Sequence, residues 1–167
     1  MQRNLIITLV LAIVFSCCST PKNTAVVSAE LKNALNNRTF TFEAQQVVPR
    51  DYRISQLFPN AGQIYHLNAG YEVKVRPDTL DVHLPFFGRA YQAPMDPTKG
   101  GIKFTSTDFD IKAGKDRKGN TELTFLPRDS REVQQMFLTV SASGYATLNI
   151  ISYQKETINF YGIVQPK

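Results

Sequence analysis

The feature that most constrains this chain is a two-residue alternation of apolar and polar side chains, which begins at residue 40 and recurs almost to the C-terminal end. Residues 71–75 and 80–84 show it most clearly. Successive side chains of a β-strand point to opposite faces, so this period places one face of each strand in a core and the other in water. The alternation therefore predicts a mainly β protein.

Turn signals divide the alternating stretches into about eight strands. Pro77 and Asp78 join two strands in a hairpin, and residues 102–111 form one uneven strand that pairs with a later one after a glycine-bearing loop. Three stretches that begin near residues 136, 146 and 158 form a meander. Short strands with a turn every 8 to 12 residues are typical of an antiparallel β-sandwich or small β-barrel. A further short strand is possible at residues 64–67.

One short amphipathic helix precedes the strands. Val27, Leu31, Ala34 and Leu35 recur at the spacing of one helical face, and two asparagines follow at 36 and 37. The eleven Phe and seven Tyr of the chain supply large apolar side chains for a β core. We therefore expect residues 27–167 to form a single β-rich domain.

The N-terminal residues have the pattern of an export signal. Arg3 precedes an apolar run from Leu5 to Phe15, which is too short to span a bilayer stably, and the run ends at Ser16 and Cys17. Val14 to Cys17 resembles the bacterial lipobox, in which the cysteine becomes diacylated. We expect residues 1–16 to be a lipoprotein signal peptide and Cys17 to carry the lipid.

Residues 17–26 are then expected to be a lipidated tether between membrane and domain. Cys18 rather than Asp follows Cys17, and no acidic cluster comes next. Two familiar sorting signals, for retention in the inner membrane and for surface display, are thus absent. The sequence predicts an exported lipoprotein at the periplasmic face of the outer membrane.

Several classes of chemistry lack their characteristic residues. Both cysteines lie at the processing site, so the domain has no disulfide, thiol nucleophile or thiolate ligand. His66 and His83, the only histidines, have no carboxylate at metal-ligand spacing. Neither a G-x-S-x-G motif nor a glycine-rich phosphate loop occurs. We expect no metal, cofactor or catalytic residue, and the modest net charge of +5 gives little support to nucleic-acid binding.

The densest local feature is the aromatic segment at residues 84–91. Phe86, Phe87, Arg89 and Tyr91 follow a strand that Pro85 ends. On one interpretation they cover a barrel end or sheet edge. On the other they line a mouth that offers stacking and one positive charge to a small hydrophobic or anionic ligand. They are the candidate binding residues.

Two charged clusters are weaker candidates. Lys112, Lys115, Arg117 and Lys118 gather in a loop, either to keep a hairpin tip solvated or to contact anionic lipid headgroups. Two pairs of residues could act as acid and base in a hydrolase, Asp108 with Asp110 and Asp81 with His83.

The chain resembles a group of Bacteroidetes lipoproteins known as domain of unknown function 4251. Residues 84–91 carry the resemblance, together with the helix followed by Phe40 and Phe42, residues 100–104 and the closing residues 158–163. The resemblance spans nearly the whole mature chain. It implies a compact single domain and a membrane-attached location, and it implies no activity or catalytic residue.

Three functional hypotheses follow. The first is a lipid-anchored cell-envelope protein that acts without catalysis as a ligand-binding or structural module. An envelope hydrolase acting on glycan or lipid is the second. The third is an inhibitor or chaperone that docks an envelope protein along an exposed sheet edge.

Overall fold

A computed structural model describes residues 23–48, 65–91 and 100–167 of the chain. In these ranges one helix, α2 (Asn23–Asn36), precedes a nine-stranded sheet. The strands are β1 (Phe40–Val48), β2 (Glu72–Val75), β3 (Leu80–Leu84), β4 (Ile102–Ser106), β5 (Phe109–Lys115), β6 (Thr121–Pro127), β7 (Val133–Val140), β8 (Tyr145–Ser152) and β9 (Ile158–Pro166).

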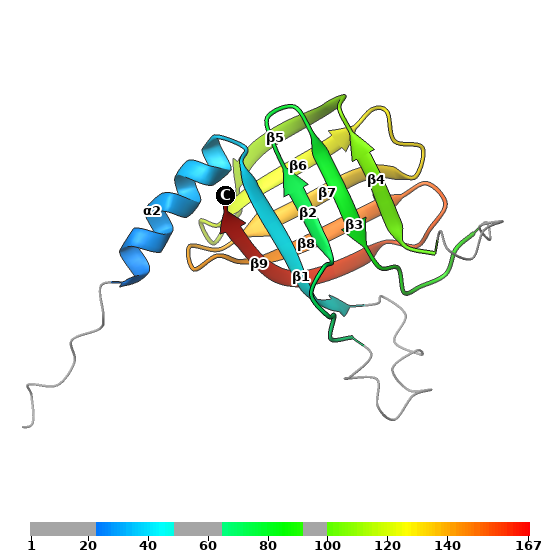
Figure 1. Ribbon diagram of the computed structural model, residues 1–167, viewed down its shortest axis with the longest axis horizontal. Helices are drawn as coiled ribbons and strands as arrows, with labels where there is room; N and C mark the ends of the chain where they lie inside the picture. Colours follow the sequence, from blue (N-terminus) through cyan, green and yellow to red (C-terminus); the bar gives the residue numbers. More distant parts are fainter. Residues whose placement is uncertain (1–22, 49–64, 92–99) are drawn as a thin grey trace, which may run out of the picture.

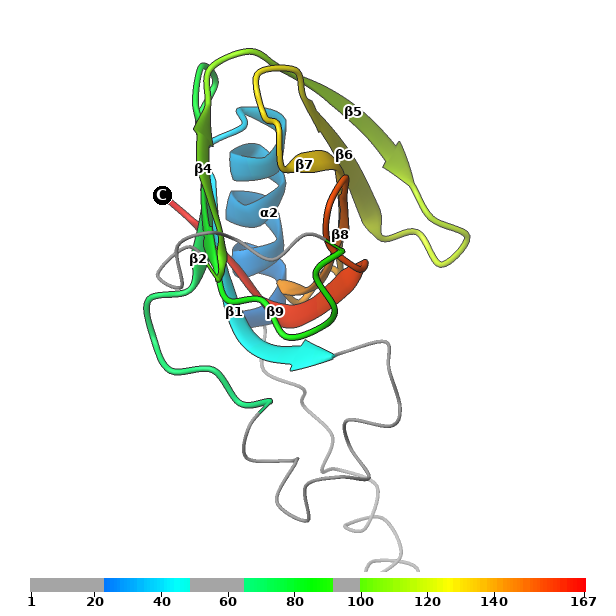
Figure 2. The same cartoon turned by 90° about the vertical axis from the view of Figure 1, so that its right-hand side faces the viewer.

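The sheet is antiparallel throughout and curls into a nearly closed barrel (Figures 1 and 2). Its strand order is β4-β3-β2-β1-β9-β8-β7-β6-β5, so most neighbours in the sheet are also neighbours in the chain. The exception is the pair formed by β1 and β9, which joins the two halves. β4 and β5 are the two edges although only two residues separate them. The prediction of a mainly β, barrel-like fold with one short helix is confirmed.

A sharp corner at residues 106–108 separates the two edge strands. The Ser106 hydroxyl donates to Asp129 Oδ1 at 2.5 Å, and the amide of Thr107 donates to Asp129 Oδ2 at 2.9 Å. These hydrogen bonds, the one from Ser106 foremost, lower the pKa of Asp129. The expectation of one uneven strand over residues 102–111 is therefore wrong, because Asp129 holds the chain in a bend.

The interior of the barrel is filled by side chains. Strand β1 alternates buried and partly exposed residues over its first five positions, and the same period continues in β7 and β8. Burying one such side chain stabilises the fold by about 1.5–3 kcal/mol. The largest fully buried residues are Phe40, Phe42, Phe125, Phe160, Leu80, Leu84, Ile102, Met136, Leu138, Leu148, Ile150 and Ile158.

Helix α2 lies at one end of the barrel, the far end in the view of Figure 2. Leu31, Ala34 and Leu35 are buried, as their spacing predicts. Arg38 ends the helix with a left-handed φ of 55°, while the Thr39 amide donates to the Ala34 carbonyl at 2.9 Å. The helix begins at Asn23, four residues before the domain start expected from the sequence. No helix in the described part of the chain is long and apolar enough to span a membrane.

A bulge in β1 brings its backbone very close to β9. The register shifts between Ala44 and Gln46, and a methyl group on Gly162 would lie 1.9 Å from the Glu43 carbonyl oxygen. Only glycine fits at this crossing. Beside the bulge, residues 65–67 hydrogen-bond to β1 through a single bridge between Gln46 and His66, where the sequence suggests a short strand; residue 64 lies outside the described ranges.

Candidate functional site

Residues 85–91, which we term the mouth segment, cross the end of the barrel opposite α2. Pro85 has no amide hydrogen and follows the last residue of β3. The segment then pairs with the loop between β8 and β9. The Tyr91 amide donates to the Gln154 carbonyl at 2.8 Å, and the Glu156 amide donates to the Arg89 carbonyl at 3.0 Å. The mouth segment is therefore held by the chain about 65 residues later in the sequence.

A buried lysine stabilises the position of the mouth segment on the end of the barrel. Lys155 is only 8% exposed, and its Nζ donates to the Gly101 carbonyl at 2.7 Å and pairs with the Glu132 carboxylate. The same Nζ lies 5.3 Å from the centre of the Phe86 ring, within the range of a cation–π contact. A buried charge is tolerated when such partners satisfy it. Lys155 thus ties together the mouth segment, the start of β4 and the loop before β7.

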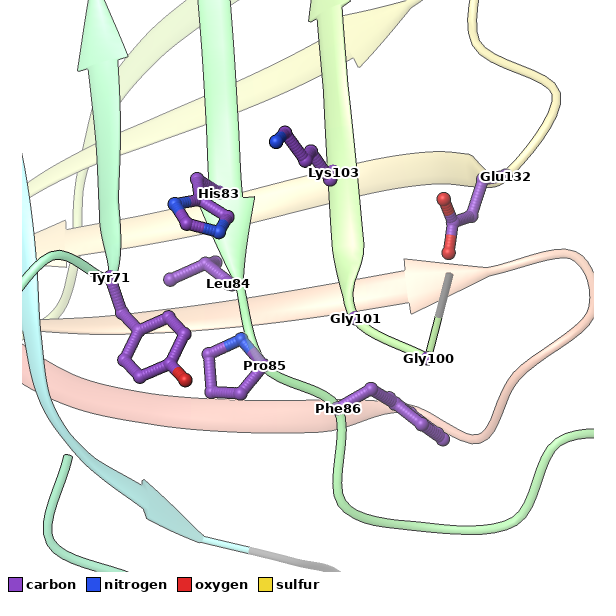
Figure 3. A pocket seen from close by; sticks show the side chains of 9 residues that line it. All are labelled: Tyr71, His83, Leu84, Pro85, Phe86, Gly100, Gly101, Lys103 and Glu132. Carbon is purple, nitrogen blue, oxygen red and sulfur yellow. The ribbon is translucent and has the colours of Figure 1, made fainter. Parts of the chain in front are cut away.

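A pocket of about 570 Å³ opens beside this network. Small-molecule sites usually have volumes of about 300–1,000 Å³. Figure 3 shows Tyr71, His83 and Pro85 on one side of the pocket and Phe86 and Glu132 on the other. The full lining consists of Tyr71, His83, Leu84, Pro85, Phe86, Gly100, Gly101, Lys103 and Glu132.

The pocket combines an apolar floor with a basic rim. The rings of Tyr71 and His83 lie 5.7 Å apart at an angle of 53°. His83 and Lys103 face each other across β3 and β4, and both side chains are exposed. Glu132, the one carboxylate of the lining, is already paired with Lys155. The arrangement suits a small ligand with an apolar or aromatic body and a negative group near Lys103.

Gly101 is part of the pocket because its backbone runs close to β3. A methyl group at this position would lie 2.7 Å from the Leu84 carbonyl oxygen. The close approach also places the Gly101 carbonyl where Lys155 can reach it.

The four candidate residues of the aromatic segment do not form one cluster. Phe86 lines the pocket, whereas Phe87 is half-buried and packs against the core. The Arg89 side chain is exposed, and its amide donates to Glu156 Oε2 at 3.4 Å. Tyr91 is 72% exposed and is not among the lining residues. Cys17, the candidate lipidation site, lies outside the described residues.

The acid and base pairs considered for a hydrolase make surface contacts. The carboxylate of Asp81 accepts a hydrogen bond from the Thr105 hydroxyl at 3.0 Å, and only His83 of that pair lines the pocket. Asp110 forms an exposed ion pair with Arg128, with N and O 2.5 Å apart. Across the described ranges, no group of three or more His, Cys, Asp or Glu residues could hold a metal ion.

The sequence did not mark four residues of the pocket and its closure as binding residues, namely Tyr71, Lys103, Glu132 and Lys155, and it marked His83 only as a candidate acid–base partner of Asp81. The alternation of β3 does place His83 on the outer face, opposite to Val82 and Leu84. Its pairing with Lys103 depends on the register between β3 and β4, which alternation alone does not determine.

The fold and the site together define a class of small antiparallel β-barrel domains with one end covered by a helix and the other closed by a mouth segment. The chain belongs to the family described as domain of unknown function DUF4251, whose model matches residues 22–164. A crystal structure of a DUF4251 family protein from Bacteroides eggerthii is similar, with a TM-score of 0.54 and 22% identity over 85% of this chain and 89% of that chain. No curated protein matches the chain.

Proposed function

We propose that this protein is a lipid-anchored component of the cell envelope that binds a small anionic ligand with an apolar body, without catalysis. The pocket beside Phe86 carries the proposal, because it places Lys103 and His83 above an apolar floor. The filled interior of the barrel supports a site at the mouth rather than one inside the sheet. The proposed anchor is a lipid on Cys17, and the proposed location is the periplasmic face of the outer membrane.

Titration with a simple probe tests the pocket. We suggest 2-naphthoate, which has an aromatic body and one carboxylate, added to the mature chain in neutral detergent and followed by ¹H–¹⁵N NMR spectroscopy. The expected result is chemical-shift changes centred on the amides of His83, Gly101 and Lys103. Because a hydrogen bond to a charged group contributes about 1.5–3 kcal/mol and this one is partly exposed, Lys103→Ala should weaken binding about tenfold.

A matched variant separates the pocket from general charge. Lys112 is also an exposed lysine on an edge strand but is not part of the lining. Lys112→Ala should leave the affinity for 2-naphthoate within about twofold of that of the unmodified chain. Equal losses in the two variants, or shift changes scattered over the barrel, would refute binding at this pocket.

The anchor is tested on its own. Cells fed an alkyne fatty acid should label the protein, and Cys17→Ser should abolish both the label and recovery in the membrane fraction. A Cys17→Ser chain that kept the label would contradict the proposed lipidation without bearing on the pocket.

An uncovered edge strand favours a second candidate function, docking of an extended protein segment. β5 is seven residues long, and five of its residues are exposed. At the two ends of the β5–β6 pair, the Arg128 amide donates to the Asp108 carbonyl and the Asp116 amide donates to the Asn120 carbonyl. In an antiparallel ladder every second residue bonds to the same neighbouring strand, so the even-numbered residues of β5 face β6. The amides of Ile111 and Ala113 are therefore directed away from β6. An added strand would bond to those free groups.

Proline substitution at the edge tests this candidate. Ala113→Pro removes an outward amide and should abolish crosslinking of β5 to an envelope protein, whereas Ala113→Ser keeps the amide and should preserve the crosslink. Crosslinking that survives Ala113→Pro would exclude docking by strand addition.

A further inference from the structure

One end of the molecule carries an excess of exposed positive charge. Helix α2 packs there against the β5–β6 loop and the β7–β8 turn, around a small cleft lined by residues that include Leu31, Leu35, Gly119 and Val140. This contact brings cations from the helix and the loop to the same end. We define the basic end by its exposed residues Lys32, Arg38, Lys115, Arg117 and Lys118.

Within the described ranges only Lys118 among these cations has a noted acidic neighbour, Asp116, whose pKa its charge helps to lower. None of them forms a salt bridge with another described residue, and Glu30 is the exposed acid of the neighbouring helix. Asp116 in the same loop is occupied: its carboxylate accepts hydrogen bonds from the Lys118 amide at 2.8 Å and the Asn120 amide at 2.9 Å. The basic end is therefore open to an external anion.

The hydrogen bonds of the loop also favour the charged form of the Asp116 carboxylate. Desolvation raises its pKa, but the hydrogen bonds from Asn120 and Lys118 outweigh this effect and leave the pKa below its usual value. The loop thus keeps a defined shape, with the side chains of Arg117 and Lys118 exposed at its tip.

The start of the helix adds a positional argument. Cys17 lies six residues before Asn23, the first residue of α2. Six residues span at most about 20 Å, so a lipid on Cys17 would keep the start of α2 within about 20 Å of the membrane surface. In Figure 1 the helix lies at the left of the barrel, at the end to which the β5–β6 loop also extends.

We propose that the basic end lies on an anionic lipid surface and binds its phosphate headgroups. The binding partner is the membrane that holds the lipid anchor. Its negative charge complements the five cations, and the anchor brings the basic end close to the membrane surface. The pocket then faces away from the membrane. Strand β7 connects the two sites, because Glu132 of the pocket directly precedes it and Val140, beside the basic end, is its last residue. The strand has eight residues and is therefore about 25 Å long.

The orientation of the barrel on the membrane rests on the proposed function, because it requires the lipid anchor on Cys17. The affinity of the basic end for lipid does not depend on that anchor. The affinity is therefore measured on the full chain carrying Cys17→Ser, by co-sedimentation with vesicles of phosphatidylcholine alone or mixed with phosphatidylglycerol. Each cation near an anionic surface changes the partition coefficient about fivefold, so a variant with Lys115→Gln, Arg117→Gln and Lys118→Gln should bind the mixed vesicles about a hundredfold more weakly.

The control removes three cations elsewhere. Lys74→Gln, Arg128→Gln and Arg131→Gln change the net charge by the same amount but lie outside the basic end, and the triple control should lose less than about fivefold. Binding should disappear in about 1 M NaCl, and 10 mM inorganic phosphate should not compete strongly against a whole surface. Equal losses in the two triple variants would overturn the proposal. Competition by free phosphate would instead indicate a single-phosphate site and would also overturn it.

Orientation is measured on the lipidated chain with no substitution. A water-soluble acetylating reagent should modify Lys103 in all vesicles, whereas Lys115 and Lys118 should be protected only when phosphatidylglycerol is present, as read by mass spectrometry. Failure of the chain to associate with any vesicle would contradict the anchor, and the co-sedimentation result would still decide the basic end. Association with uniform lysine reactivity would contradict the orientation alone.

Discussion

The two ends of the barrel are closed by different physical means. At the helix end, Leu31, Ala34 and Leu35 bury apolar surface against the sheet. At the mouth end, the closure depends on Lys155, whose charge is satisfied by Glu132, the Gly101 carbonyl and the Phe86 ring. Apolar burial tolerates small displacements, whereas a buried charge needs all its partners in place. We therefore expect the helix end to be sensitive to side-chain volume and the mouth end to the loss of single polar groups.

The difference also separates two kinds of surface. The helix end has exposed cations with no salt bridge to another described residue, while the mouth end has a pocket in which the one lining carboxylate is paired. A diffuse surface can bind a diffuse charge such as a membrane, and a walled pocket can select one small ligand.

The largest expected effect is at the helix end. Leu35→Ala removes a side chain that is 7% exposed and should lower the free energy of unfolding by about 3 kcal/mol, because it leaves a cavity under the helix. Urea denaturation followed by circular dichroism measures this change. Asn33→Ala, at an exposed position of the same helix, should stay within about 0.5 kcal/mol. If both variants were equally stable, apolar burial would not be what closes this end.

A smaller loss is expected at the mouth end from Lys155→Met. The variant leaves Glu132 and the Gly101 carbonyl without their partner, and since the Glu132 side chain is 29% exposed we expect a loss of about 2 kcal/mol. Adding Glu132→Leu should recover part of this loss, because both charges are then gone. A double variant less stable than Lys155→Met would show that the charge of Glu132 has another role.

The smallest expected effect is the response of the β4–β5 corner to acid. Asp129, which lies in the same loop as Glu132, holds this corner through the hydrogen bonds that it accepts from Ser106 and Thr107. The pKa of Asp129 is lower in the folded protein than in the unfolded chain, so its stabilising contribution is complete above the unfolded pKa and is lost as the pH falls through the folded pKa. Hydrogen exchange should show the amides of Thr107 and Asp108 losing protection on acidification. The Thr39 amide at the helix end, which donates to a backbone carbonyl, should not follow.

Asp129→Asn should make corner protection insensitive to acid. Asp78→Asn is the control, since within the described residues the carboxylate of Asp78 accepts a hydrogen bond from the adjacent Thr79 hydroxyl alone. If the protection of the corner amides relative to their intrinsic exchange rate stayed the same at all acidic pH values in the unmodified chain, the charge of Asp129 would not be what holds the corner.

Several elements were predictable from the sequence because their signals are local. The spacing of Leu31, Ala34 and Leu35 predicts the buried face of α2, and alternation with Pro77 and Asp78 predicts the β2–β3 hairpin. The corner between β4 and β5 was not predictable in this way. Ser106 is fully buried, but its partner Asp129 comes 23 residues later and gives no signal near the bend.

The candidate site shows the same limit. Phe86 stood out because three aromatic residues occur close together, and it does line the pocket. Lys103, Glu132 and Lys155 did not stand out, because isolated charged residues usually lie in solvent. Their roles depend on strand register and on contacts between distant parts of the chain.

The sequence by itself determined the class of fold, the helix that precedes the strands and the absence of cysteine from residues 19–167. Alternation and helical period are properties of neighbouring residues, and composition is a simple count. The tertiary structure alone decided that the sheet closes with β4 and β5 as its edges, that Lys155 seals the mouth, and that cations from α2 and the β5–β6 loop share one end. These features depend on pairs of residues brought together by curling of the sheet, and no local pattern specifies such pairs.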